Sequence, residues 1–185
     1  MRSLKSKPRN ASKTKADILA AAQTCFSKVG YSQAGIRDIA AIAAVSSPML
    51  LRYFGSKAGL FEAALTESVR AGGLYSQERA GFGERIIRLF LDVDLDIKTP
   101  SIIALSTGDS DARDIVTRVM AEHVVRPLSK WLGPPDARAR ALEIIILAIG
   151  FVLFTRQYRL ITARTSLEKK LSKQFARTLQ AIVDQ

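Results

Sequence analysis

The stretch GIRDIAAIAAVSSPMLLRYFG, residues 35–55, holds two short apolar runs of helical spacing. The first run is built on Ile36 and Ile39. The second begins after Ser46, whose hydroxyl can cap a helix N-terminus, and carries Pro48 in the first turn, where a missing N–H is harmless. Two short helices joined by a turn of about three or four residues are the spacing of a helix-turn-helix, here at about 36–55.

The second of these helices has the composition of a segment that enters a DNA groove. It begins with small hydroxyl residues and ends in Arg52 and Tyr53. A major groove about 12 Å wide admits one helix, and the N-terminal residues of that helix reach base edges. Arg37, Arg52 and Lys57 can meet phosphates, and Lys57 follows Ser56, a second N-cap whose free backbone N–H groups favour an anion.

The segment before the motif is expected to be one amphipathic helix behind a basic arm. Apolar residues recur at helical spacing from Thr14 to Gly30; Thr14 with Asp17 suggests a capping box, and Gly30 suits the C-terminal stop. Residues 1–13 are polar and basic and are expected to form a flexible arm. Beside a helix-turn-helix, contact of this arm with phosphates or the minor groove is favoured over a merely solvated tail.

The remainder also reads as helices, and no segment shows the strict alternation of a strand. Stripes of helical spacing predict helices around residues 82–90 and 116–131, and longer helices over about 136–158 and 166–183. Proline and glycine residues separate them. The predicted fold class is all-α, with a small basic N-terminal unit and a larger C-terminal helical bundle.

Composition restricts the partner and the compartment. The 185 residues include 28 Lys and Arg against 17 Asp and Glu, a net charge of +11. Residues 1–70 hold 11 basic and 4 acidic side chains, so most of the surplus lies at the motif. A 48% hydrophobic content excludes a disordered polycation. The single Cys25 excludes an internal disulfide, fits a reducing cytoplasm, and is placed to pack in the core.

Residues that could belong to catalytic, metal-binding or nucleotide-binding motifs lack the partner residues that those motifs require. One histidine and one cysteine provide neither a catalytic triad nor a zinc site, so no enzyme, metal or cofactor is expected. The acids at 92, 94 and 96 lack the glycine and glutamate of a calcium loop. Gly81 and Gly83 lack the third glycine and preceding strand of a dinucleotide loop. The apolar run at 144–154 is too short to span a membrane.

Four motifs in order, TKADILAAAQTCFSKVGY, IRDIA, AAVSSPMLLRYF and GSKAGLFEAAL, resemble the TetR family of transcription regulators from Thr14 to about Leu65. The resemblance implies a helix-turn-helix domain over 14–56, a connecting helix over 57–70, and a ligand-binding and dimerisation domain over 71–185. By position it implies that the DNA-binding residues are Arg37, Ser46, Ser47, Met49, Leu51, Arg52, Tyr53 and Lys57.

The sequence departs from the family's usual pattern at the motif itself. Ala34 and Gly35 stand where the family usually has Ser or Thr, which removes a cap and a phosphate contact. Ala44 replaces a turn glycine, at a cost of about 1 kcal/mol if its φ is positive. Pro48 and Leu51 stand at Gly and Tyr positions, and Leu51 cannot donate a hydrogen bond to the DNA backbone. Operator sequence and affinity therefore do not transfer from the family.

The expected function is that of a homodimeric DNA-binding repressor, dimerised through its last two helices. Its two recognition helices would enter major grooves about 34 Å apart on a palindromic operator, and a small-molecule ligand would release it. The expected ligand contacts are Met120, His123, Trp131, Phe151 and Phe154. The alternative is an architectural protein that binds nucleic acid without sequence preference, which competition against non-specific DNA would distinguish.

Overall fold

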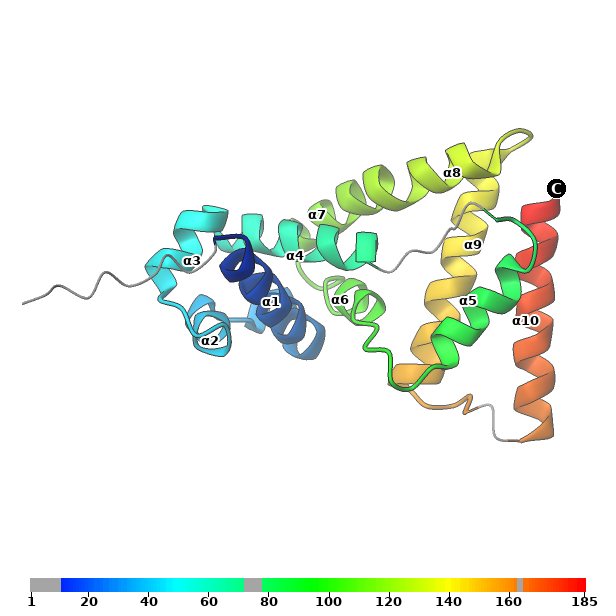
Figure 1. The fold of residues 1–185 in the computed structure, drawn as a ribbon, viewed down its shortest axis with the longest axis horizontal. Helices are drawn as coiled ribbons and strands as arrows, with labels where there is room; N and C mark the ends of the chain where they lie inside the picture. Colours follow the sequence, from blue (N-terminus) through cyan, green and yellow to red (C-terminus); the bar gives the residue numbers. More distant parts are fainter. Residues whose placement is uncertain (1–10, 72–77, 163–164) are drawn as a thin grey trace, which may run out of the picture.

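A computed structural model describes residues 11–71, 78–162 and 165–185 of the chain. Every regular element in these ranges is helical, as the sequence predicts, and none of the described residues forms a strand. The molecule is elongated (Figure 1). Helices α1 to α3 lie at one end, α9 and α10 lie at the other, and α4 and α7 run between them.

The N-terminal unit contains α1 (Ala11–Gln33), α2 (Ile36–Ile42) and α3 (Ser47–Phe54), followed by α4 (Lys57–Ala71). Helix α1 kinks at Gly30, whose φ of 75° lies in the region that favours glycine. A Cβ at this position would lie 3.0 Å from the carbonyl oxygen of Leu105, so Gly30 also permits close contact with the C-terminal domain. The sequence predicts a helix end at Gly30; the helix kinks there instead and continues to Gln33.

The predicted start of α1 is wrong. The helix begins at Ala11, and Thr14 lies inside it with 4% of its surface exposed, so the expected capping box with Asp17 does not form. Thr14 faces the core, where its γ-methyl can pack. Residues 11–13, placed in the arm by the sequence, are helical, and the rest of the predicted arm lies outside the described residues.

Two serines set the beginnings of α3 and α4, as predicted. The Ser46 hydroxyl oxygen accepts a hydrogen bond from the Met49 amide at 3.3 Å, and that of Ser56 accepts one from the Gly59 amide at 3.0 Å. A first core, with Phe26, Ile39 and Leu50 at 0% exposure, holds the three helices against α4. Cys25 is part of this core, and burial raises the pKa of its thiol, which suits the predicted packing role.

The C-terminal domain consists of further helices: α5 (Phe82–Leu91), α6 (Thr99–Ala104), α7 (Ser110–Met120), α8 (Arg126–Leu132), α9 (Ala137–Val152) and α10 (Ser166–Asp184). A π-helical turn, Ala121–Val125, joins α7 to α8, and another, Leu153–Gln157, extends α9. Helix α6 was not predicted. Its Pro100 reads as a break in the sequence, but a proline in the first turn of a helix costs no hydrogen bond.

Close packing and one buried arginine hold α5, α9 and α10 together. Helix α5 lies against α10 at Gly83, where a Cβ would be 1.9 Å from the carbonyl oxygen of Ala176. The Arg140 side chain of α9 is 3% exposed and donates to the carbonyls of Ile182 and Val183 at 2.8 and 2.9 Å. These two carbonyls lie at the C-terminal end of α10, where helix carbonyls lack partners, so Arg140 fastens α10 to α9.

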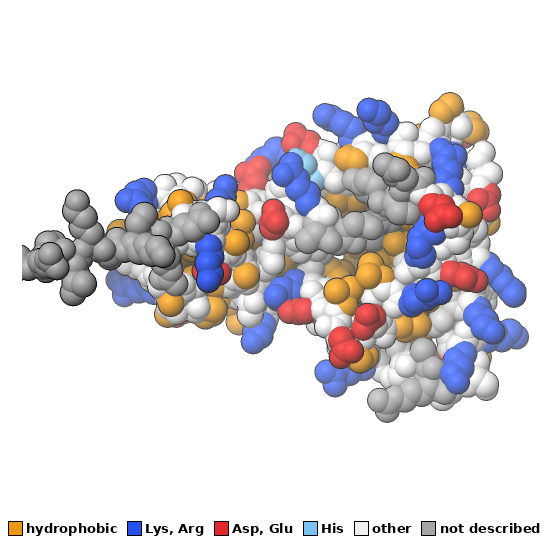
Figure 2. All heavy atoms as spheres, in the orientation of Figure 1, with side chains coloured by type: hydrophobic (Ala, Val, Ile, Leu, Met, Phe, Trp, Pro, Cys, Tyr) orange, Lys and Arg blue, Asp and Glu red, His pale blue; other side chains and the backbone are white. Residues whose placement is uncertain are grey.

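Basic side chains are not confined to the N-terminal end. On the face shown in Figure 2, Lys and Arg side chains lie over α1 to α3 and also along the edge formed by α10. Exposed basic residues of α10 are Lys169, Lys170, Lys173 and Arg177. Among the helices described, none is long and apolar enough to cross a membrane.

Candidate nucleic-acid interface and ligand cavity

Helix α3 is anchored by one side and presents the other to solvent. Leu50 is fully buried in the first core, and Tyr53 and Phe54 pack partly against it. Met49 and Leu51 are 38% and 39% exposed, and Arg52 is exposed beside them. This exposed surface of α3 combines two apolar side chains with one cation, a set that can contact thymine methyl groups and one phosphate or guanine.

The turn before α3 has the backbone anticipated from the sequence. Ala44 adopts a φ of 52°, while the Val45 amide donates to the carbonyl of Ala40 at 3.0 Å and closes the turn. A non-glycine residue in this region carries strain of about 1 kcal/mol. Exposed Ser46 and half-buried Ser47 follow the turn, so the cap places their small side chains at the tip of α3.

Arg37 and Lys57 flank this surface in different ways. Arg37 is exposed in the first turn of α2, whose N-cap position, Gly35, provides no side-chain cap. Lys57 is half-buried; its ammonium donates to the carbonyl of Ser32 at 3.2 Å and lies 4.7 Å from the centre of the Tyr31 ring. Lys57 therefore already holds the end of α1, and a phosphate would add to these contacts.

Asp109 connects this corner to the C-terminal domain. Its carboxylate caps α7 by accepting from the Ala112 amide at 3.0 Å, and it accepts from the Ser32 hydroxyl at 2.9 Å. The Ala112 amide and then the Ser32 hydroxyl lower the pKa of Asp109, because both donate to its charged form. The ends of α1, α4 and α7 thus meet in one hydrogen-bonded group.

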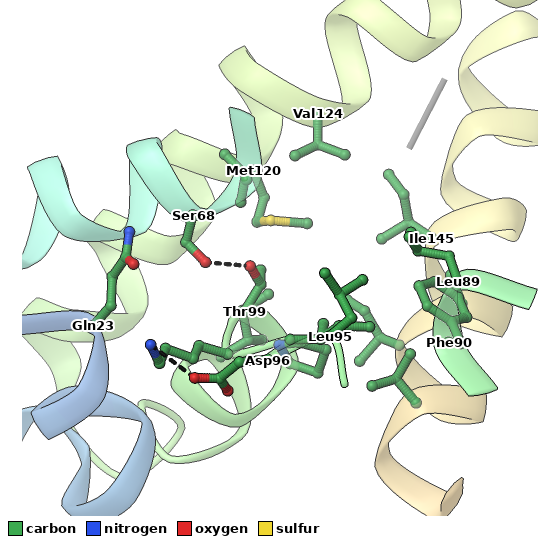
Figure 3. A pocket seen from close by; sticks show the side chains of 18 residues that line it. Gln23, Ser68, Leu89, Phe90, Leu95, Asp96, Thr99, Met120, Val124 and Ile145 are labelled. Atoms are coloured by element: carbon green, nitrogen blue, oxygen red, sulfur yellow. Dashed lines mark hydrogen bonds and ion pairs between the residues drawn. The ribbon is translucent and has the colours of Figure 1, made fainter. Parts of the chain in front are cut away.

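A cavity of about 260 Å³ lies between the N-terminal unit and the C-terminal domain (Figure 3). Its walls come from α1, α4, α5, α6, α7 and α9, from the loop before α6, and from the π-helical turn after α7. The apolar lining residues are Val69, Leu89, Phe90, Leu95, Ile97, Pro100, Ile103, Met120, Val124, Ile145, Ala148, Ile149 and Val152. The polar ones are Gln23, Ser68, Asp96, Lys98 and Thr99.

Of the five expected ligand contacts, only Met120 lines this cavity. His123 is half-buried within the π-helical turn, and Trp131 packs against Phe82 with their ring centres 5.3 Å apart. The prediction extended one helical stripe through this region. The π-helical turn changes the register, so Val124 reaches the cavity and His123 does not.

Phe151 of α9 and Phe154 of the π-helical turn that follows it also lie elsewhere. A second core packs α5, α8, α9 and α10 together, and Phe151 is 2% exposed within it, between Phe90 and Phe175. Phe154 is 46% exposed beside Tyr158. The long apolar run of α9 gave no sign of which side faces the cavity. Ala148 and Val152 face it instead.

The sequence analysis missed the polar part of the lining. The Gln23 side-chain amide donates to the carbonyl of Ala64 at 3.0 Å, and the hydroxyls of Ser68 and Thr99 lie 2.5 Å apart. Gln23 and Ser68 are polar residues on otherwise apolar helical faces, which was a usable signal. Thr99 comes from the unpredicted α6 and had none.

Comparison with known proteins agrees with this arrangement. The family model described as bacterial regulatory proteins, tetR family, matches residues 18–64, and the model described as tetracyclin repressor-like, C-terminal domain, matches residues 80–183. No curated protein sequence matches the chain. Solved structures share its fold at low sequence identity.

Three of these structures illustrate the likeness. Salmonella enterica GusR is 17% identical with a TM-score of 0.68, covering 96% of this chain and 97% of that one. The fatty acid degradation regulator FadR from Bacillus halodurans is 17% identical with a TM-score of 0.66, covering 89% and 97%. A tetR-family transcriptional regulator from Streptomyces coelicolor is 24% identical with a TM-score of 0.61, covering 92% and 80%. With both of its domains matched, this chain belongs to the TetR family of bacterial transcriptional regulators.

Proposed function

We propose that the protein is a homodimeric repressor that binds a palindromic operator through α3 and is released by a small molecule in the cavity. It would act as a regulator in the cytoplasm without catalysing a reaction. The observation that carries the proposal is the composition of the cavity wall, which joins α1 and α4 to α6, α7 and α9. A ligand there touches both the DNA-binding unit and the domain behind it.

The exposed surface of α3 supports the DNA contact. Arg52 provides the charge, Met49 and Leu51 provide apolar contacts, and Arg37 stands at the start of α2. Selection of genomic fragments bound by the purified protein tests this. The expected result is a palindromic consensus with half-sites about 34 Å apart, bound at least about 10³-fold tighter than non-specific DNA. Salt-sensitive binding without sequence preference would instead identify an architectural protein.

A pair of arginine variants tests the assignment of α3. Arg52→Ala should weaken binding to the selected operator by about tenfold or more, because a base or phosphate contact is lost. Arg88→Ala is the control, since Arg88 is an exposed arginine on α5 in the C-terminal domain. Circular dichroism should show unchanged helicity in both. Full operator affinity in Arg52→Ala would refute the assigned surface.

The exposed side of α9 supports dimerisation through the last two helices. Leu142 and Ile146 of α9 and Phe154 of the π-helical turn that extends it are 39%, 69% and 46% exposed. At Gly150, between them, a Cβ would meet nothing within 4 Å. A row of large apolar side chains in water is costly, and a second copy of the same surface would cover it.

Sedimentation equilibrium tests the dimer. Ile146→Asp should convert the protein to a monomer at micromolar concentration, because a charge would be buried in the interface. Val93→Asp, at a residue 83% exposed in the loop after α5, should leave the mass unchanged. The monomeric variant should lose affinity for the palindrome while keeping its weak affinity for a half-site. A dimer that survives Ile146→Asp would contradict this interface.

Ligand release follows from differential binding. A ligand lowers DNA affinity only if it binds the non-DNA conformer more tightly, and typical coupling is about 1–3 kcal/mol. The Ser68–Thr99 hydrogen bond joins α4 to α6 at the cavity wall, so a ligand that alters this contact can change the position of α4. Operator-bound protein titrated with candidate effectors should release DNA in a saturable way.

A further inference from the structure

The cavity has two chemically different ends. In Figure 3, the polar side chains Gln23, Ser68 and Thr99 lie beside α1 and α4, and Leu89, Phe90 and Ile145 lie on the opposite side. An occupant that satisfies both ends must carry its polar group at one end of an apolar body. Such an occupant would place its polar group next to the helix that connects to the DNA-binding unit.

Lys98 gives the polar end its charge. Among the described residues that line the cavity it is the only cation, and its side chain is 21% exposed. Its partner in this structure is Asp96, 2.9 Å away, whose side chain is 74% exposed. An ion pair with so exposed an acid is weak, and Asp96 can turn into water at little cost. A carboxylate brought by a ligand can therefore take its place at the less exposed Lys98.

The volume limits the apolar body. A cavity of roughly 150 Å³ accommodates benzene, so the observed 260 Å³ suits a ring with a short side chain, about ten to twelve non-hydrogen atoms. Phe90 and Met120 favour an aromatic ring, since aromatic and thioether groups make favourable contacts with it. Long-chain ligands of drug size or more exceed this space.

We propose that the cavity binds a small monocarboxylic acid with a compact aromatic or branched body, its carboxylate replacing Asp96 at Lys98. This inference rests on the proposed function, because it names the chemical class of that function's effector. The carboxylate would lie next to the Ser68 and Thr99 hydroxyls, either of which can donate to it. A charge-assisted hydrogen bond in this half-enclosed site would then distinguish the acid from its neutral analogues.

Calorimetric titration of the DNA-free, full-length protein tests the class with three probes that share one body: phenylpropionate, phenylpropanol and phenylpropylamine. The acid should bind about tenfold or more tightly than the alcohol, and the amine should bind most weakly, because Lys98 repels it. Equal or tighter binding of the alcohol overturns the proposal. No measurable binding of the acid at millimolar concentration overturns it too.

Two variants test the role of the ion pair with opposite expected signs. Lys98→Met should weaken binding of the acid by about tenfold, while binding of the alcohol should stay unchanged or become tighter. Asp96→Asn should tighten binding of the acid by about two- to fivefold, because the carboxylate that competes for Lys98 is gone. Lys130→Met, an exposed lysine of α8, is the matched control. If neither Lys98→Met nor Asp96→Asn changes the affinity for the acid, the proposal is overturned.

The binding assay contains no DNA, so its result stands apart from that of the repressor. Acid binding with the expected dependence on Lys98 supports the inference even if the acid does not change operator binding. Unchanged operator binding would count only against the proposal of ligand release. Operator binding with a palindromic consensus, together with no acid binding, would support the regulator and overturn the inference.

Discussion

Arg118 of α7 forms a two-point ion pair with Glu62 of α4: its Nε and Nη2 donate to the two carboxylate oxygens at 3.1 and 2.9 Å. Both side chains are partly exposed, at 48% and 41%. The pair joins the connecting helix to the helix that leads into the cavity wall at Met120. A change in the position of α4 relative to α7 must stretch or break it.

Glu62→Gln should lower the stability of the protein only slightly, because exposed ion pairs contribute little to folding. Its larger effect should fall on the equilibrium between conformers, so operator affinity and ligand response should change in opposite directions. Thermal unfolding and operator titration measure the two effects. Glu67→Gln, an exposed acid of the same helix, is the control. A large drop in Tm without a change in operator affinity would show that the pair is mainly structural.

Ala44→Gly should stabilise the protein by about 0.5–1 kcal/mol, because glycine adopts the observed φ of 52° without strain. Part of the gain from relieved strain is offset because glycine makes the unfolded chain more flexible. This corresponds to a rise of about 1–4 °C in Tm for a chain of this size. Ala41→Gly, in the nearby α2 helix, should destabilise by about the usual helical cost of glycine. Equal effects of the two substitutions would refute the strain at Ala44.

Asp109 should make stability depend on pH in the acid range. Its folded-state pKa is lowered, so its contribution is fully present above its unfolded pKa of about 3.9 and is lost as the pH falls through the lower folded value. Asp109→Asn retains a capping group but does not titrate. The difference in Tm between wild type and this variant should therefore shrink as the pH falls from 6 towards about 2. A difference that stays constant over this pH range would contradict this role of Asp109.

Gly83→Ala should destabilise the far end by about 1–3 kcal/mol or more, because the added methyl group meets the backbone of α10 rather than a movable side chain. Urea unfolding measures the loss. Gly108→Ala is the matched control, since a Cβ at Gly108 meets nothing within 4 Å. Two variants of equal stability would show that α5 and α10 can separate without cost.

The features that local sequence determines were predictable. Ser46 and Ser56 cap α3 and α4 because a hydroxyl three residues before a free amide satisfies it, whatever surrounds the helix. The positive φ at Ala44 occurs where the TetR family usually has a turn glycine. Helix α10 has almost the predicted bounds, and its capping box at Thr165 strengthens its start.

Features that depend on distant parts of the chain were not predictable in the same way. Thr14 resembles a cap in the sequence but is buried by tertiary packing. His123 falls on a helical stripe, but the π-helical turn rotates it away from the cavity. Lys98 and Asp96 become part of a cavity wall only because α6 brings their loop beside α4, and nothing in their immediate sequence indicates this.

Val69, half-buried near the end of α4, packs against both hydrophobic cores and also lines the cavity. Each core is otherwise closed around its own large side chains, such as Phe61 in the first and Phe151 in the second. Because this one side chain packs against both cores, the packing of each core depends on its position.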